Sequence, residues 1–307
     1  MKSIPIPEIQ MKDLGNKAFT IDTPSHHISL NNIVLCVAKK QSGKTYFISN
    51  LLNQLQQANC MDRIIVVSST FDSNKKMMEN LNIHPDDILD PNDPDVVFKI
   101  RTKINQERDD ILEYREKIKL WKKFKNTIAS IDMEQLEYYT ESMLMFYNPE
   151  TNNFEPPKHR WNGRKPTIGI FCDDIQSSAI IGNKQFKNLT IRHRHEGSFQ
   201  SGEPPIGCSL FICVQNYTAS GNEGIPKSIR GNVNCVALWK TGNMKELDLI
   251  TTELSGCIPK QKILDAYNYV MDYDPDNRHN FLFIDLSKKK EHPSPFRMNY
   301  NEWIIDT

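Results

Sequence analysis

The segment that most constrains how this chain folds is an apolar run followed by a polar loop that ends in Ser42-Gly43-Lys44-Thr45. The run, Ile33–Val37, consists of aliphatic residues and one cysteine, which favours a buried β-strand. The residues from Tyr46 to Gln57 have the pattern of a helix. A strand, a glycine-containing loop and a helix in this order are typical of a phosphate-binding loop, because N–H groups at the start of the helix point toward an anion. The sequence therefore predicts a P-loop over Ala38–Thr45.

The P-loop residues have distinct expected roles, and the expected ligands are ATP and Mg²⁺. Gly43 lets the backbone approach the phosphates, Lys44 reaches the β and γ oxygens, and the Thr45 hydroxyl binds Mg²⁺. Ala38 stands where the usual pattern has its first glycine, and alanine lacks glycine's free access to positive φ. The residues expected to surround the nucleotide are Ala38, Lys39, Lys40, Gln41, Ser42, Gly43, Lys44, Thr45 and Tyr46.

A second apolar run, Thr167–Cys172, is followed directly by Asp173 and Asp174. A P-loop is expected to have such a partner strand, whose first acid holds the Mg²⁺ hydration shell. We assign this role to Asp173, and we assign to Asp174 the role of general base or water-orienting group in attack on the γ-phosphate. The alternative is that these aspartates only cap a following helix, because aspartate is favoured at that position.

Gln215 directly follows a third apolar run, Leu210–Val214. Ligands of open α/β sheets bind at the carboxyl ends of strands, so Gln215 is a candidate sensor for the γ-phosphate or the attacking water. The alternative is a plain polar cap at the end of the strand.

Three arginines are candidates for a guanidinium that neutralises the charge developing on the γ-phosphate. Arg230 is the first candidate for such an arginine finger, acting across a subunit boundary, and Arg192 or Arg194 come next. The alternative interpretation is that these arginines lie on the surface or contact a DNA backbone.

Strand-like apolar runs alternate with helix-like stretches along most of the chain. This alternation predicts an α/β fold with a mostly parallel sheet and helices on both faces. We expect an N-terminal arm over residues 1–29, the core over 30–287 and a C-terminal tail over 288–307. The charged segment 101–165 interrupts the rhythm and predicts a helical insertion, either a solvated surface element or an arm that contacts DNA or another subunit. The remaining expected strands are 64–68, 233–238 and 281–286, and a further helix is expected over 244–254.

Composition restricts the partners and the compartment. Lys+Arg and Asp+Glu both number 38, so any nucleic-acid contact must come from a local patch or from a ring of subunits. No apolar run approaches the length of a membrane span, and the N-terminus lacks the apolar core of a signal peptide. The seven cysteines form no CxxC pair, which favours reduced thiols in a soluble, cytosol-like compartment.

Five segments in this order carry a resemblance to a known family: VAKKQSGKT, IGIFCDD, RHRH, FICVQN and IPKSIRGNVN. Together they resemble the poxvirus-type branch of the FtsK–HerA class, the DNA-packaging ATPases of large eukaryotic DNA viruses and virophages. The matches fall between residues 33 and 240. Two departures are Ala38 in place of glycine and Asp174 in place of the glutamate common in the wider class, and a third is the longer spacer GSFQSGEPP before the sensor strand.

The resemblance implies a RecA/FtsK-like fold and an ATP-driven DNA translocase. It carries the family's roles to Lys44, Thr45, Asp173, Asp174 and Gln215, and the finger role to Arg230. It implies a homo-oligomeric ring, a pentamer or hexamer, that acts on double-stranded DNA at a viral capsid vertex. The location that it implies is the host cytoplasm, in a viral factory, or the virion.

Two other functional classes share a P-loop. A small-molecule or nucleotide kinase usually has an arginine-rich lid and no strand ending in glutamine after the acidic pair. A nucleotide-binding assembly protein would switch without rapid hydrolysis, and the departures at Ala38 and Asp174 keep that class open.

Overall fold

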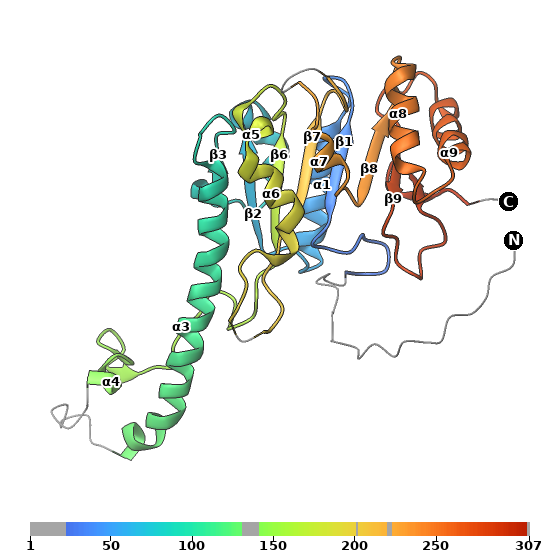
Figure 1. The fold of residues 1–307 in the computed structure, drawn as a ribbon. Helices are drawn as coiled ribbons and strands as arrows, with labels where there is room; N and C mark the ends of the chain where they lie inside the picture. Colours follow the sequence, from blue (N-terminus) through green and yellow to red (C-terminus); the bar gives the residue numbers. More distant parts are fainter. Residues whose placement is uncertain (1–22, 131–140, 201, 220–222, 306–307) are drawn as a thin grey trace, which may run out of the picture.

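The computed structural model describes residues 23–130, 141–200, 202–219 and 223–305. Within these residues the main sheet has nine strands in the order β11-β10-β9-β8-β1-β7-β6-β2-β3 (Figure 1). The strands from β8 to β3 pair in parallel, whereas β9, β10 and β11 are added antiparallel at one edge. Their bounds are Ile33–Val37 for β1, Arg63–Ser68 for β2, Ile88–Leu89 for β3, Ile168–Asp173 for β6, Ser209–Val214 for β7, Cys235–Trp239 for β8, Phe281–Asp285 for β9, Phe296–Met298 for β10 and Glu302–Trp303 for β11.

Successive side chains of each central strand point to opposite faces of the sheet. Both faces are buried beneath helices. In β1, Val34 and Cys36 belong to one apolar cluster, while Ile33, Leu35 and Val37 belong to the other. The first face packs against α1 (Lys44–Gln57) and α2 (Phe71–Met78). The second face is covered by α3 (Val96–Ser130), α5 (Ala179–Gly182), α6 (Lys184–Arg192), α7 (Lys227–Arg230), α8 (Met244–Leu254) and α9 (Lys260–Tyr273). The expected mostly parallel α/β fold with helices on both faces is confirmed.

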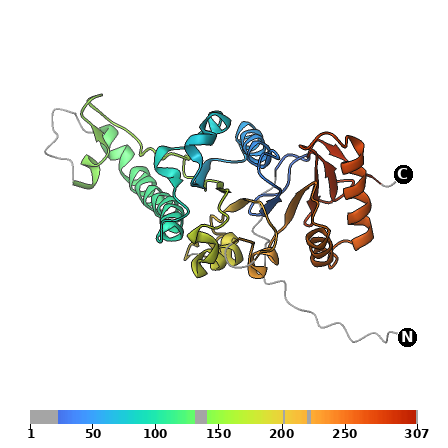
Figure 2. The ribbon, with the colours of Figure 1, turned by 90° about the horizontal axis from the view of Figure 1, so that it is seen from above.

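The expected helical insertion is formed mainly by α3, which begins at Val96. Its first turns are part of the core, since Ile100, Ile104 and Ile111 are fully buried, and the rest of the helix extends away from the sheet (Figures 1 and 2). A small apolar cluster near its far end includes Met143, Phe146 and Phe154. The cluster joins α3 to α4 (Glu141–Leu144) and to the hairpin of β4 (Tyr147–Asn148) and β5 (Asn153–Phe154). Residues 131–140 of the expected insertion lie outside the described residues.

Ion pairs fix the base of α3 to the sheet. Arg63, the first residue of β2, contacts Asp87 at 2.7 Å and Glu107 at 2.8 Å. Glu107 also accepts a 2.6 Å hydrogen bond from the indole of Trp161. The side chain of Asp87 is only 1% exposed, and the Arg63 guanidinium offsets the cost of its burial, so the pKa of Asp87 is lowered. The insertion is therefore rigidly attached at its root.

The segment expected as a C-terminal tail contributes to the sheet. Strands β10 and β11 continue it beyond β9, so the boundary expected at 287/288 falls between two paired strands. Arg297 of β10 is 2% exposed and lies 3.9 Å from the ring centre of Trp303. On the N-terminal side, Ile28 is fully buried and its N–H donates to the Tyr300 hydroxyl at 3.2 Å. Both flanks pack here because the outer edge and faces of β9 would otherwise remain uncovered. Residues 1–22 of the expected arm lie outside the described residues.

Two expectations from composition can be compared with the structure. None of the helices in the described ranges is both long and apolar enough to span a membrane. All seven cysteines are unpaired, and Cys36, Cys172, Cys208, Cys213 and Cys235 are buried. Burial raises the pKa of the Cys172 thiol far above its ordinary range, which favours a packing role for this residue.

Candidate nucleotide-binding site

The strand order brings three separate segments to one edge of the sheet. Strand β7 pairs with β1 on one side and with β6 on the other, all in parallel, so their carboxyl ends lie together. The loop after β1, Gln215 after β7 and the acidic pair at the end of β6 consequently border one cavity of about 410 Å³. Its lining residues are Lys40, Gln41, Ser42, Gly43, Lys44, Thr45, Tyr46, Thr70, Ser73, Asn74, Asp173, Asp174, Gln215 and His279.

The loop after β1 has a backbone conformation that requires glycine at position 43. Gly43 directly precedes helix α1 and has a φ of 98°, a backbone conformation that residues with a Cβ rarely adopt. Gln41 has a positive φ of 62°, whereas Ala38 is not among the described non-glycine residues with positive φ. The alanine at the first position of the motif is therefore accommodated without left-handed strain.

Lys44 is 8% exposed and folds back over the loop. Its ammonium group donates to the carbonyl of Ala38 at 2.6 Å and to that of Lys39 at 3.0 Å. An ammonium group has three donors, so a third remains for a ligand in the cavity. Of the nine residues expected around the nucleotide, seven line the cavity. The other two, Ala38 and Lys39, orient Lys44 through their carbonyls.

Thr45 and Asp173 meet although they come from different elements. The Thr45 hydroxyl donates to Oδ1 of Asp173 at 2.9 Å, and the amide of Asn74 donates to Oδ2 at 3.0 Å. Asp173 is 1% exposed, and burial raises its pKa above the ordinary value; the neighbouring Asp174 adds to the rise, while the bonds from Thr45 and Asn74 and the charge of Lys44 oppose it. A divalent cation at this place would relieve the cost of the buried carboxylate.

The donor set fits Mg²⁺. A hydroxyl and a carboxylate are hard oxygen donors, and Mg²⁺ in phosphate sites is bound by one or two protein oxygens together with substrate phosphates and water. Within the described ranges no cluster of three or more His, Cys, Asp or Glu side chains could hold a metal by itself. Thr45 and Asp173 are therefore the residues that would hold Mg²⁺ together with a bound nucleotide.

Asp174 and Gln215 form a second pair at this edge. The Gln215 amide donates to Oδ1 of Asp174 at 3.0 Å. Asp174 has a φ of 49°, a conformation uncommon for non-glycine residues, and strain of this kind is concentrated at functional sites. The side chain of Gln176 accepts from the N–H groups of Gln215 at 2.7 Å and Asn216 at 3.1 Å, which fixes the end of β7.

The three candidate arginines lie elsewhere in the same chain, and the lining of the cavity contains no arginine among the described residues. Arg230 forms an ion pair with Glu253 at 2.8 Å and lies 4.9 Å from the ring centre of Tyr217. Its guanidinium also donates to the carbonyl of Ile225 at 2.7 Å, and it lowers the pKa of Glu253. Within one chain, three of the five N–H donors of Arg230 are thus engaged in structural contacts.

Arg192 and Arg194 lie near the amino ends of the central strands, opposite the strand ends that carry the P-loop. Arg194 donates to the carbonyl of Asn31, which precedes β1, and His193 accepts at its carbonyl from the N–H of Cys208, which precedes β7. These contacts are at the amino ends of the strands, a full strand length of roughly 17 Å from the P-loop edge. Neither arginine can therefore reach the cavity of its own chain.

Five residues at the site were missed by the sequence reasoning: Thr70, Ser73, Asn74, Gln176 and His279. Nothing in the pattern around Asn74 or His279 indicates a ligand, because both reach the cavity through tertiary contacts. His279 contacts the loop through a 3.1 Å hydrogen bond between Nδ1 and the carbonyl of Ser42. Gln176 could have been noticed as a polar residue that follows the acidic pair closely.

Comparison with known proteins gives structural similarities alone. No family model and no curated protein matches the chain. One similar solved structure is the genome packaging NTPase B204 of Sulfolobus turreted icosahedral virus 2 in complex with sulfate, with 12% identity over 89% of this chain and 98% of that one and a TM-score of 0.43. Another is the DNA-packaging ATPase B204 of Sulfolobus turreted icosahedral virus, with 13% identity, coverage of 88% and 97% and a TM-score of 0.43.

A third is the monomer of the pCW3 conjugation coupling protein TcpA with ATPγS, with 14% identity, coverage of 83% of this chain and 59% of that one and a TM-score of 0.38. The TM-scores are below 0.5, so these similarities carry no argument about function.

Proposed function

We propose that the chain binds ATP with Mg²⁺ in the cavity at the P-loop edge and hydrolyses the bond between its β- and γ-phosphates, releasing ADP and phosphate. The observation that supports this most is the hydrogen bond from Thr45 to Asp173, because it joins the P-loop helix to the acidic strand at a point suited to a metal ion. Lys44 lies beside this pair, buried and with a donor available. The same cavity also contains a second acid and an amide that bond to each other.

Each residue of the site has a separate role in this proposal. Lys44 and the N–H groups at the start of α1 hold the β- and γ-phosphates. Thr45 and Asp173 hold Mg²⁺, which supplies charge neutralisation on the phosphate oxygens. Asp174 accepts the proton of the attacking water, and Gln215 orients Asp174 through the bond between their side chains. The short side chain of Asp174, on a backbone with a φ of 49°, reaches the Gln215 amide at the end of β7.

We further propose that hydrolysis drives translocation of double-stranded DNA by a ring of five or six copies, as at a viral capsid vertex. The motif resemblance supports this, and so does one feature of the site. The cavity has no arginine from its own chain among the described residues, although γ-phosphate hydrolysis gains greatly from a guanidinium. A neighbouring copy would supply it, with Arg230 as the first candidate. Gln215 at the end of β7 argues against a small-molecule or nucleotide kinase, because such kinases usually have no strand ending in glutamine after the acidic pair.

The test is an ATPase assay of the full chain with and without double-stranded DNA, combined with mass measurement of the assembly. We expect ATP turnover that DNA stimulates, together with a ring of subunits. ATP turnover in a monomer that DNA does not affect would overturn the translocase proposal and leave the ATPase. Absence of any ATP binding would overturn both.

A further inference from the structure

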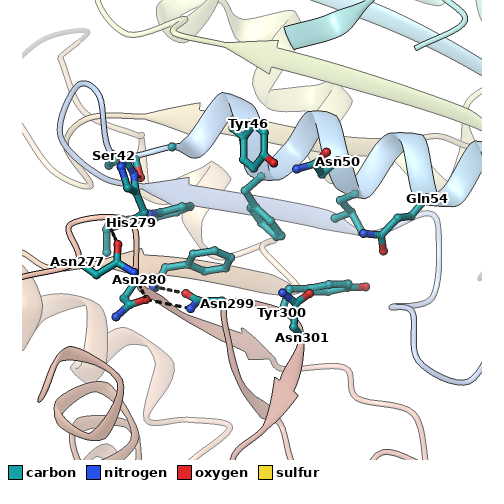
Figure 3. A pocket seen from close by; sticks show the side chains of 15 residues that line it. Ser42, Tyr46, Asn50, Gln54, Asn277, His279, Asn280, Asn299, Tyr300 and Asn301 are labelled. Carbon is teal, nitrogen blue, oxygen red and sulfur yellow. Dashed lines mark hydrogen bonds between the residues drawn. The ribbon is translucent and has the colours of Figure 1, made fainter. Parts of the chain in front are cut away.

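A second cavity of about 600 Å³ adjoins the phosphate site. It shares Ser42, Gly43, Tyr46 and His279 with the first cavity, so the two spaces are continuous across the P-loop. Figure 3 shows helix α1 along one side, with Tyr46, Asn50 and Gln54. The opposite side is formed by the segment around His279 and by the residues after β10. No role of the triphosphate requires this space.

The second cavity combines flat apolar walls with carboxamides. Trp239 and Phe281 are stacked with ring centres 4.4 Å apart, and Phe47 lies 4.6 Å from Phe281. Carboxamides lie around these rings, and some of them fix one another: Oδ1 of Asn280 accepts from Asn277 at 3.2 Å and from Asn299 at 3.0 Å (Figure 3). The residues that bring carboxamides to the lining are Asn50, Gln54, Asn277, Asn280, Asn299 and Asn301.

Two buried polar groups in the lining have no hydrogen-bond partner within the described part of the chain. They are the hydroxyl of Ser42, a residue 8% exposed, and the indole N–H of Trp239, a residue 3% exposed. Buried polar atoms are nearly always paired, and leaving one unpaired costs about 1–3 kcal/mol. Both residues line the second cavity, and their two unpaired atoms lie within its wall.

His279 lies at the junction of the two cavities. Its Nδ1 is 3.1 Å from the Ser42 carbonyl, and because a carbonyl only accepts, Nδ1 carries the proton. This leaves Nε2 available to a ligand. A Cβ built on Gly43 would lie 3.4 Å from His279 Nδ1, so the histidine covers the loop closely where a ligand would pass from one cavity to the other.

The direction of a bound nucleotide follows from the strand order. The acids lie on the β7 and β6 side of the loop, whereas the second cavity lies on the β8 and β9 side. A triphosphate whose terminal phosphate faces Asp173 and Asp174 would extend its other end past His279 and Tyr46. We propose that the second cavity binds the base and ribose of the nucleotide, with the aromatic residues against the base and the carboxamides at its edges. This inference rests on the proposed function of the phosphate site.

The test compares ATP with inorganic tripolyphosphate, both with Mg²⁺, in equilibrium binding to the full chain. On the unmodified protein we expect ATP to bind at least about tenfold more tightly, because only ATP fills the second cavity. Equal affinities would overturn the inference while leaving the phosphate site intact. Failure of both ligands to bind would overturn it together with the proposed function.

A cavity-filling variant makes the test specific for this place. Asn50→Trp on α1 is expected to weaken ATP binding by about tenfold or more and to leave tripolyphosphate binding unchanged. The matched control is Gln57→Trp, an exposed position at the end of the same helix and outside both cavities, which is expected to change neither affinity. If Asn50→Trp binds ATP as the unmodified protein does, the base lies elsewhere. If Asn50→Trp loses its thermal unfolding transition, the comparison of the two ligands on the unmodified protein decides.

Discussion

The Thr45 hydroxyl and the Asp173 carboxylate, 128 residues apart in the sequence, lie 2.9 Å apart and are joined by a hydrogen bond. The bond connects the first turn of α1 to the end of β6, with β7 between the two parent strands. Both oxygens face the same cavity as Lys44.

Lys44→Ala should abolish ATP turnover and weaken ATP binding by about tenfold or more, because it removes the one buried ammonium group that lines the cavity within the described residues. The measurements are a steady-state ATPase assay and equilibrium binding. Lys76→Ala, at an exposed position of α2 outside the cavity, is the matched control and should behave as the unmodified protein. Turnover near the unmodified level in Lys44→Ala would exclude this cavity as the site of hydrolysis.

Asp173→Asn should raise thermal stability in nucleotide-free, Mg²⁺-free buffer at neutral pH. Burial raises the pKa of Asp173 above its ordinary value of 3.8, so the folded chain holds this proton more tightly than the unfolded chain. The unmodified protein therefore loses stability as the pH rises from the ordinary pKa through the raised one. The asparagine variant carries no such penalty, so its advantage in melting temperature should shrink as the pH is lowered toward 4. An equal pH dependence of both proteins would contradict the burial argument, whereas loss of Mg²⁺-dependent ATP binding in the variant would support the metal role.

Asp174→Asn should leave ATP binding within about twofold of the unmodified protein and reduce the turnover number by a factor of about 10² or more, since an amide cannot accept the proton of the attacking water. Single-turnover hydrolysis and equilibrium binding measure the two effects separately. Asp72→Asn, at an exposed position in the first turn of α2, serves as the control. If ATP binding is lost together with turnover, Asp174 maintains the structure of the site instead.

Arg230→Ala should stop turnover if this arginine reaches the site of a neighbouring copy, and mixing it with Lys44→Ala protein should restore part of the activity. In such mixed rings some interfaces combine an intact Lys44 with an intact Arg230 from the neighbour. The control is Glu253→Gln, which weakens the ion pair within the chain but keeps the guanidinium. Arg230→Ala should also lower stability by about 1–3 kcal/mol, because it removes the guanidinium from the half-buried Glu253 carboxylate, which keeps its bond from the Tyr217 hydroxyl, and from the Ile225 carbonyl.

Two results would contradict the finger role of Arg230. One is an equal loss of turnover and stability in Glu253→Gln and Arg230→Ala, which would mean that the ion pair only stabilises the fold. The other is an absence of recovery in the mixed assemblies.

The sequence by itself determined the elements whose signals are local. The strand before the P-loop, the helix after it and the acidic strand that ends at Asp173 were all predictable, because apolar runs, helical patterns and strand ends depend on neighbours in the chain. The strand boundaries differ from the expected ones by at most two residues, as in β8, which begins at Cys235. Residues 288–307, expected as a tail, contain β10 and β11, which extend the sheet beyond β9. This pairing depends on long-range contacts and has no local signal in the sequence.

Only the tertiary structure decided which of these elements meet. The strand order places β7 between β1 and β6, and this brings Gln215 onto Asp174 and Thr45 onto Asp173. Arg194 lies at the amino ends of the central strands, away from the cavity. Arg230 forms an ion pair with Glu253. Both arginines follow the acidic pair in the sequence, which does not indicate either position. His279 reaches the P-loop from a segment 237 residues away. Such contacts depend on how strands are ordered and packed, and local patterns of hydrophobicity and turns do not specify that order.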